Sequence, residues 1–263
     1  MNNEQTEEPK LLAGGKIMSL FEHLAELRTR LVRAISAITL VFLGCIFYAT
    51  PIINFLKKPL NAALPLEEET LHFTGPLEVL FADMKVAFFA ALILASPYWL
   101  YQFWKFIEPA LYVSERRYVL PFVWSSVLLF VAGISFSFYL IIPMCLDFLL
   151  TLGMEVGQPM ITVSDYLSLL IIMVLGFGFV FETPLILVLL ASLDVINSKM
   201  LSMYRKYVIV LILIIAALIT PPDPVSQLSM AIPLYIMYEI SILIIRAMER
   251  RKMVRKRADE TGV

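Results

Sequence analysis

The stretch Trp104–Arg117, WKFIEPALYVSERR, decides how the rest of the chain is organised. Pro109 lacks an amide hydrogen and disfavours helical geometry at the residue before it, so an apolar helix must end here. Ser114 can cap a new helix, and Glu115 would lie in its first turn, beside the positive end of the helix dipole. We therefore predict a short loop between two helices.

Arg116 and Arg117 close this loop. Clustered arginines beside an apolar segment are typical of the cytoplasmic side of a bilayer. The simplest interpretation is that the charges of the loop only set the topology and cap a helix. A binding role for Glu115 needs support from the rest of the chain.

Composition indicates an integral membrane protein. Of the 263 residues, 60% are hydrophobic and 16% are charged, whereas soluble domains carry about 25% charged residues. The mean hydropathy is +0.82. The two cysteines and two histidines are too few and too separated for a metal site or redox chemistry. Residues 1–18 are polar, lack the order of a cleaved signal peptide and are expected to form a disordered tail.

Apolar runs predict an all-α membrane domain over residues 19–246 with six transmembrane helices, followed by a basic cytoplasmic tail over residues 247–263. The spans are expected at about 34–53, 83–106, 118–142, 166–191, 207–220 and 228–245. Pro97 predicts a kink in the second span, and Pro143 is expected to end the third. The loop between the first two spans is expected to hold a short interfacial helix.

The fifth and sixth spans are predicted to be short. About 14 residues of helix rise only about 21 Å, less than a hydrocarbon core of about 30 Å. The proline-rich turn PPDPVSQ between them cannot continue a helix. These two helices are therefore expected to thin the bilayer locally.

The segment before the first span, SLFEHLAELRTRLVR from Ser19, is amphipathic and predicts a helix along the membrane surface. Glu22 and Glu26 are four residues apart on its polar side, and Arg30 can partly neutralise Glu26. A solvated helix face explains this pattern, but two neighbouring acids would also suit a cationic guest.

Positive charge predicts that both termini are cytoplasmic. Of the 21 lysines and arginines, only Lys57, Lys58 and Lys85 fall in segments assigned to the outside. An even number of spans agrees with this orientation under the positive-inside rule.

Three acids near or within the spans need an explanation. Glu182 lies well inside the fourth span, where an ionisable group costs about 2.5–3.5 kcal/mol, so it should face protein or water. It is either a functional residue or a carboxyl bonded to a hydroxyl such as Ser168. Glu239 can reach toward the interface near Arg246, and Asp223 is typical of a proline turn.

Four segments of the chain resemble the TatC component of the twin-arginine protein translocase. They are HLAELRTRL at 23–31, the long segment 76–117 from PLEVLFADMK to the opening loop, FGFVFETPL at 177–185, and TPPDPVSQLSMAIPLYIMYEI at 220–240. They occur in the family's order and at its spacing. One departure is Glu108, where the family usually has an uncharged residue, and it would add an acid beside the expected site.

The resemblance implies a concave six-helix receptor, not an enzyme, in the bacterial cytoplasmic membrane. It would bind the twin-arginine signal peptides of folded preproteins and assemble with itself and with TatA/TatB-type single-span proteins. Transport would use the proton-motive force without a cofactor, a metal or nucleic acid. The residues that match the family's signal-binding positions are Glu26, Glu115, Phe106, Arg116 and Arg117. Glu182 would lie where a partner helix docks. Pro59 and Asp223 match family positions whose roles are less settled.

The paired acids support this interpretation on chemical grounds. A guanidinium prefers a bidentate carboxylate, and lysine reproduces such a contact poorly. Two arginines would therefore bind two acids, here Glu26 and Glu115. The competing hypothesis is a proton-coupled transporter of small solutes with Glu182 as its ion site; an intramembrane enzyme is a more distant alternative.

Overall fold

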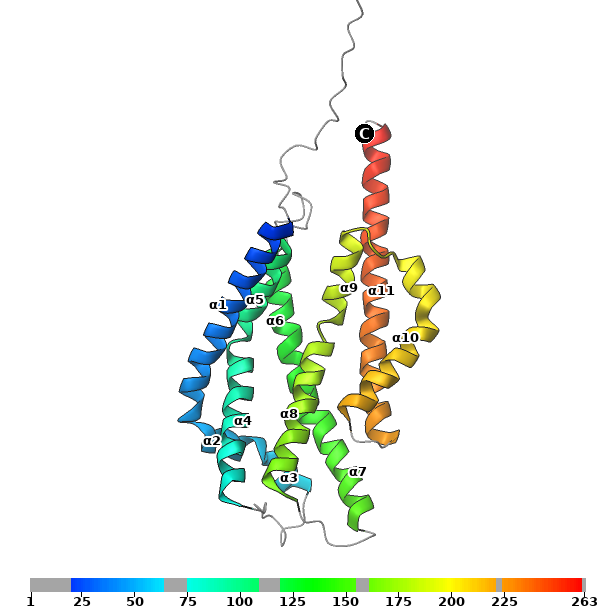
Figure 1. Ribbon diagram of the computed structural model, residues 1–263. Helices are drawn as coiled ribbons and strands as arrows, with labels where there is room; N and C mark the ends of the chain where they lie inside the picture. Colours follow the sequence, from blue (N-terminus) through cyan, green and yellow to red (C-terminus); the bar gives the residue numbers. More distant parts are fainter. Residues whose placement is uncertain (1–19, 64–74, 109–118, 155–160, 221–223, 262–263) are drawn as a thin grey trace, which may run out of the picture.

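The computed structural model describes residues 20–63, 75–108, 119–154, 161–220 and 224–261, which fold into a bundle of helices. Figure 1 shows α1, α4 and α5 on one side, α10 and α11 on the other, and α6 to α9 between them. Five helical segments are long and apolar enough to cross a membrane, and a bent pair makes a sixth. The prediction of an all-α chain with six spans is thus confirmed.

Helix α1 (Leu20–Ile46) is continuous, so the expected separate surface helix is wrong. The polar first turns pack against α5 and simply extend the first span. The span also ends earlier than the predicted residue 53, and two short helices follow, α2 (Ala49–Leu56) and α3 (Lys58–Ala63). A single short helix was predicted in this loop, and the structure has two; Pro59 is buried in α3.

The second span consists of α4 (Pro76–Leu94) and α5 (Ser96–Ile107). The two helices are bent by 57° at Ala95. Pro97 lies in the first turn of α5, where a missing amide hydrogen costs nothing, so the predicted kink is confirmed.

The third span contains α6 (Val119–Phe136), the π-helical turn η3 (Ser137–Ile141) and α7 (Ile142–Met154). Pro143 does not end it, contrary to the prediction. The amide of Ile142 donates to the carbonyl of Ser137, a wider turn that accommodates the following proline. The helix therefore continues past the apolar core.

The fourth span is broken. Helix α8 (Val163–Val180) ends at Phe181, and α9 (Thr183–Ser192) starts after Glu182. Pro184 occupies the first turn of α9, where proline is tolerated. Glu182 therefore lies at the junction between the two helices.

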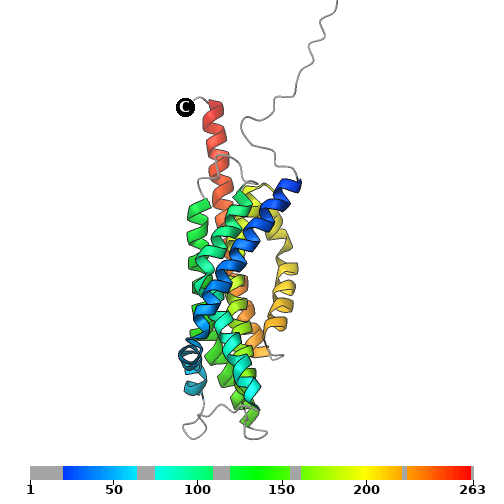
Figure 2. The same cartoon turned by 60° about the vertical axis from the view of Figure 1, so that its left-hand side comes forward.

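The last two helices are longer than predicted. Helix α10 (Ser198–Ile219) has 22 residues because Asn197 caps it well before the apolar stretch, and α11 (Pro224–Thr261) has 38 and runs on through the basic tail. The expectation that the helices themselves are short is therefore wrong. Still, the end of α10 and the start of α11 do not reach as far down the bundle as the lower ends of α4, α7 and α8 (Figures 1 and 2).

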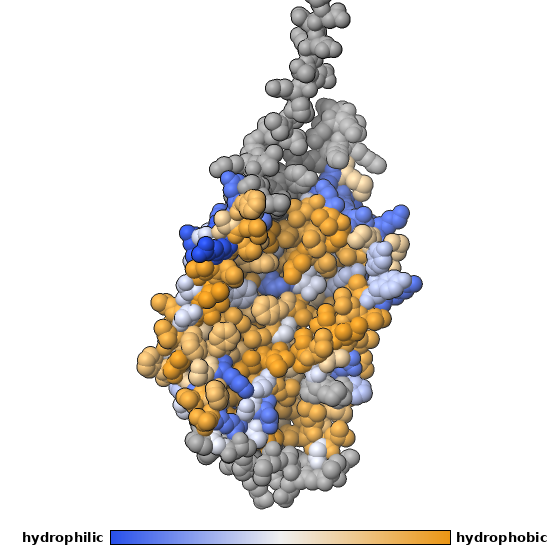
Figure 3. Space-filling model, in the orientation of Figure 1, coloured by the Kyte–Doolittle hydropathy of each residue, from blue (hydrophilic) through white to orange (hydrophobic). Residues whose placement is uncertain are grey.

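Close packing of α6 against α8 forms the centre of the bundle. Gly133 faces the carbonyl of Phe177, and Gly178 faces the ring of Phe130, so small residues let these helices approach. Apolar side chains also cover the outside as a broad belt (Figure 3), as a lipid environment requires. The start of α1 and the end of α11 lie at one end of the bundle, which we name the terminal end (Figure 1).

Candidate functional site

A polar cluster at the terminal end joins α1 to α5. The Nε and Nη2 atoms of Arg30 donate to one oxygen of Glu26 at 3.3 and 2.9 Å, and its Nη1 donates to Oε1 of the buried Gln102 at 3.2 Å. The predicted neutralisation of Glu26 by Arg30 is confirmed. Glu26 therefore already has one cationic partner.

The second carboxylate oxygen of Glu26, Oε2, does not take part in these hydrogen bonds. This atom is buried and has no hydrogen-bond partner among the described residues. A buried carboxylate oxygen without a donor is costly, and a charged donor would satisfy it best. Glu26 therefore retains one acceptor for a further cation.

Aromatic side chains flank this cluster. The rings of His23 and Phe106 stack with centroids 4.4 Å apart and an interplanar angle of 19°. Next to them, Lys105 forms an ion pair with Glu108 at 2.5 Å. The unusual acid at position 108 is thus neutralised within its own helix rather than left as an extra arginine acceptor.

Several predicted site residues cannot be placed. Glu115, Arg116 and Arg117 lie outside the described residues, as does Asp223. Pro59 is described, but it belongs to α3 at the opposite end of the bundle from the Glu26 cluster (Figure 1). Of the predicted set, Glu26 and Phe106 lie at the same end of the bundle: Phe106 lines a groove together with Arg30, the ion-pair partner of Glu26.

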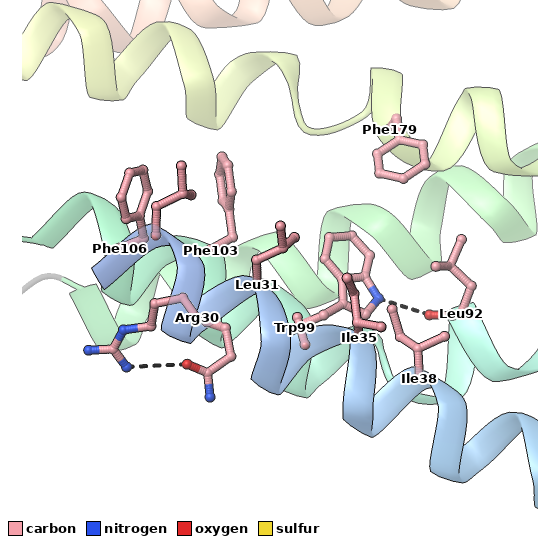
Figure 4. A pocket seen from close by; sticks show the side chains of 12 residues that line it. Arg30, Leu31, Ile35, Ile38, Leu92, Trp99, Phe103, Phe106 and Phe179 are labelled. Atoms are coloured by element: carbon pink, nitrogen blue, oxygen red, sulfur yellow. Dashed lines mark hydrogen bonds between the residues drawn. The ribbon is translucent and has the colours of Figure 1, made fainter. Parts of the chain in front are cut away.

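A groove of about 260 Å³ begins beside this cluster and follows α1 along α5. Figure 4 shows Arg30, Phe103 and Phe106 at one end and Ile38 and Leu92 at the other. Its remaining lining residues are Leu27, Leu31, Ala34, Ile35, Trp99, Gln102 and Phe179. The groove is apolar apart from the polar end. Sequence periodicity did not reveal it, because it depends on how α1 packs against the other helices.

Glu182, at the break between α8 and α9, is only 7% exposed. Its Oε2 accepts a hydrogen bond of 2.6 Å from the hydroxyl of Ser126 in α6, while its Oε1 has no partner among the described residues. The suggested partner Ser168 instead receives a hydrogen bond from Lys85. Glu182 is thus nearly enclosed by the described residues.

A second polar cluster, missed by the sequence analysis, joins α10 to α11. Nε and Nη2 of Arg205 contact the two oxygens of Glu239, each at 2.8 Å, and the hydroxyl of Tyr235 donates to Glu239 at 2.8 Å. Glu239 therefore turns to α10 rather than toward Arg246, which binds Ser202. No group of His, Cys, Asp or Glu that could hold a metal ion occurs within the described part of the chain.

Comparison with known proteins decides the family. The family model "Sec-independent protein translocase protein (TatC)" matches residues 22–233. The chain belongs to the TatC family. One similar relative is a TatC of Desulforapulum autotrophicum, which is 41% identical over 88% of this chain and 85% of that protein. Another is TatCy of Bacillus subtilis, which is 39% identical over 92% of this chain and 94% of that protein.

Solved TatC structures agree with this assignment. A crystal structure described as a twin arginine translocase receptor, TatC, aligns with a TM-score of 0.77 at 38% identity and covers 86% of this chain and 99% of that one. A second, obtained in the detergent DDM, gives a TM-score of 0.78 at 39% identity, with 85% and 99% covered. The protein is thus a multi-pass membrane component of a protein translocase, which is a transport subunit and not an enzyme.

Proposed function

We propose that this TatC chain is the receptor and core subunit of a twin-arginine translocase and that it binds paired-arginine signal peptides at its terminal end. The observation that carries this proposal is the buried Oε2 of Glu26, which has no donor among the described residues. A peptide guanidinium would satisfy it with a charge-assisted hydrogen bond. Glu115, from the adjacent loop, would supply the second carboxylate for the second arginine.

The surroundings of Glu26 fit an arginine better than a lysine. The stacked rings of His23 and Phe106 offer a flat surface beside it, and a planar guanidinium can stack on an aromatic face while a compact ammonium cannot. Arg30 keeps the Glu26 carboxylate in place through its other oxygen. Arg116 and Arg117 would complete the loop around the peptide.

Orientation follows from the same proposal. The chain would lie in the bacterial cytoplasmic membrane with both termini inside. The positive charge near them supports this orientation, and so does the start of α1 at the same end of the bundle as the end of α11 (Figure 1). Signal peptides synthesised in the cytoplasm would then meet Glu26 directly.

Assembly completes the proposed role. TatA/TatB-type helices would dock near Glu182, whose Oε1 has no hydrogen-bond donor among the described residues. They would also dock against α10, whose outer face is rich in exposed apolar residues such as Met203, Tyr207 and Leu218. Further copies of this chain would join the complex, and transport would use the proton-motive force rather than a bound cofactor.

Binding of four peptides to the full-length chain in lipid nanodiscs tests the receptor role. The peptides carry Arg-Arg, Arg-Lys, Lys-Arg or Lys-Lys. We expect Glu26→Gln and Glu115→Gln each to weaken Arg-Arg binding about tenfold or more, since a hydrogen bond to a charged group contributes about 1.5–3 kcal/mol. Each variant should also discriminate less between arginine and lysine at one peptide position.

Glu22→Gln is the matched control because Glu22 lies one turn away on the same helix. It should bind all four peptides like the parent chain. If Glu26→Gln lost the same affinity for every peptide, Glu26 would not read arginine and the proposal would be refuted. Flux of small solutes through vesicles holding this chain alone would instead favour the transporter hypothesis.

A further inference from the structure

A buried amide side chain contacts the Glu26 cluster from α5. Gln102 is only 4% exposed, and its Oε1 accepts a hydrogen bond of 3.2 Å from Nη1 of Arg30 (Figure 4). This hydrogen bond joins α5 to α1, whereas the contacts between Arg30 and Glu26 stay within α1. Gln102 therefore connects the cluster to a second helix.

The chemistry of the two groups fixes their orientation. A guanidinium has donors only, so Gln102 must turn its oxygen and not its nitrogen to Arg30. Arg30 uses Nη1 for Gln102, and its Nε and Nη2 for Oε1 of Glu26. All three nitrogens of this planar group are thus bonded, and the group cannot rotate without breaking one of these contacts.

A fixed guanidinium also limits where the Glu26 carboxylate can lie. Without Gln102, Arg30 and Glu26 would form an ion pair within one helix, and ordering two flexible side chains has an entropic cost. With Gln102, Arg30 is held by α5, and Oε1 of Glu26 is held by Arg30. The buried Oε2, which has no donor among the described residues, then keeps one direction.

A neutral amide suits this position better than a carboxylate. A negative charge at position 102 would compete with Glu26 for Arg30, because charge-assisted hydrogen bonds are the stronger ones. The amide oxygen of Gln102 accepts a hydrogen bond and leaves the ion pair between Arg30 and Glu26 intact. The residue at 102 can therefore orient Arg30 without drawing it away.

We propose that Gln102 is a positioning residue for signal-peptide binding, which acts through Arg30 to hold Oε2 of Glu26 toward the bound arginine. This inference rests on the proposed function, because it needs Glu26 to bind the peptide. Gln102 itself is not expected to touch the peptide, since it is buried. A planar guanidinium needs an acceptor in a fixed direction, whereas the rotatable donors of an ammonium tolerate a displaced one. Gln102 would therefore favour arginine over lysine at one peptide position.

Gln102→Met tests this role, because methionine has a similar length and shape but lacks the amide oxygen. The full-length chain in lipid nanodiscs is titrated with the Arg-Arg, Arg-Lys, Lys-Arg and Lys-Lys peptides. We expect the affinity for Arg-Arg to fall about threefold to tenfold, because one hydrogen bond to a charged group is lost one step away from the peptide. The affinity for the peptide with lysine at the position that Glu26 reads should change little. Gln102→Leu, which has a different shape and no acceptor, should give the same pattern.

Ser96→Ala is the matched control. Ser96 is also a buried polar residue of α5, but it precedes Gln102 by about 9 Å at helical rise. This variant should bind all of the peptides like the parent chain.

The double variant Glu26→Gln with Gln102→Met separates positioning from a structural defect. If Gln102 acts through Glu26, the double variant should bind each peptide like Glu26→Gln alone, because residues that act as a unit are not additive. A defect in the packing of α1 against α5 would add its own loss to every peptide.

The outcomes distinguish this inference from the receptor role. Unchanged binding by Gln102→Met, an equal loss for all four peptides, or additive losses in the double variant would overturn the positioning role while Glu26→Gln still weakens Arg-Arg binding. If Glu26→Gln bound every peptide like the parent chain, the receptor role at Glu26 would fail, and the role of Gln102 would fail with it.

Discussion

Replacement of Gly133 by Ala should destabilise the bundle where α6 meets α8. A Cβ atom at this position would lie 2.6 Å from the carbonyl oxygen of Phe177 and 2.9 Å from the Cγ atom of Phe181. The closest atom belongs to the backbone, so it cannot move aside by a change of rotamer. The two helices would have to separate.

The magnitude follows from two opposing effects. Overpacking of a close contact costs typically 1–3 kcal/mol, and a rigid backbone neighbour places Gly133 near the upper end. Alanine in a helix interior is favoured over glycine by about 1 kcal/mol. The net loss should therefore be about 1–2 kcal/mol.

Gly44→Ala provides the matched control, because Gly44 is also within a span but has no atom within 4 Å of its Cβ position. It should gain up to about 1 kcal/mol from helix propensity alone. Reversible unfolding in mixed detergent micelles should separate the two variants by about 2–3 kcal/mol. If Gly133→Ala were as stable as Gly44→Ala, α6 and α8 would not approach as closely as we describe.

Two further predictions concern the buried polar pairs. Ser126→Ala should lower the free energy of unfolding by about 1–3 kcal/mol in the same assay, because it removes the hydrogen-bond donor to Glu182. Glu182→Gln tests the docking of a TatB-type partner that we propose. Co-purification of this variant with the partner would show whether docking needs only hydrogen bonding or a charge. Arg205→Leu should lower the free energy of unfolding by about 1–3 kcal/mol, because Glu239 keeps only its hydrogen bond from Tyr235. The double variant with Glu239→Leu should regain this stability. If it did not, the pairing of Arg205 with Glu239 would be refuted.

Apolar runs predicted the spans well but their ends poorly. Hydropathy marks the residues in contact with lipid, whereas hydrogen bonding and capping decide where a helix ends. Asn197 therefore starts α10 several residues before its apolar part, and the π turn at Ser137 lets the third span pass Pro143. Neither effect changes the hydropathy pattern.

Local site contacts were predictable, and distant ones were not. The pair Glu26 and Arg30 is four residues apart on one helix, so helical spacing alone indicated it. Ser126 and Glu182 are separated by 56 positions, and their contact depends on which faces of α6 and α8 meet. Periodicity gives the apolar face of each helix but not its partner across the bundle.

Helix α11 passes from the bundle into the polar tail without a break. Ile245 is the last of its fully buried residues, and from there to Thr261 the helix extends about 24 Å at helical rise. Because this segment continues the same helix, any tilt or rotation of the buried part of α11 moves its C-terminal end by a larger distance. A spectroscopic label near Thr261 would therefore report, from the aqueous side, how α11 moves inside the bilayer while cargo is transported.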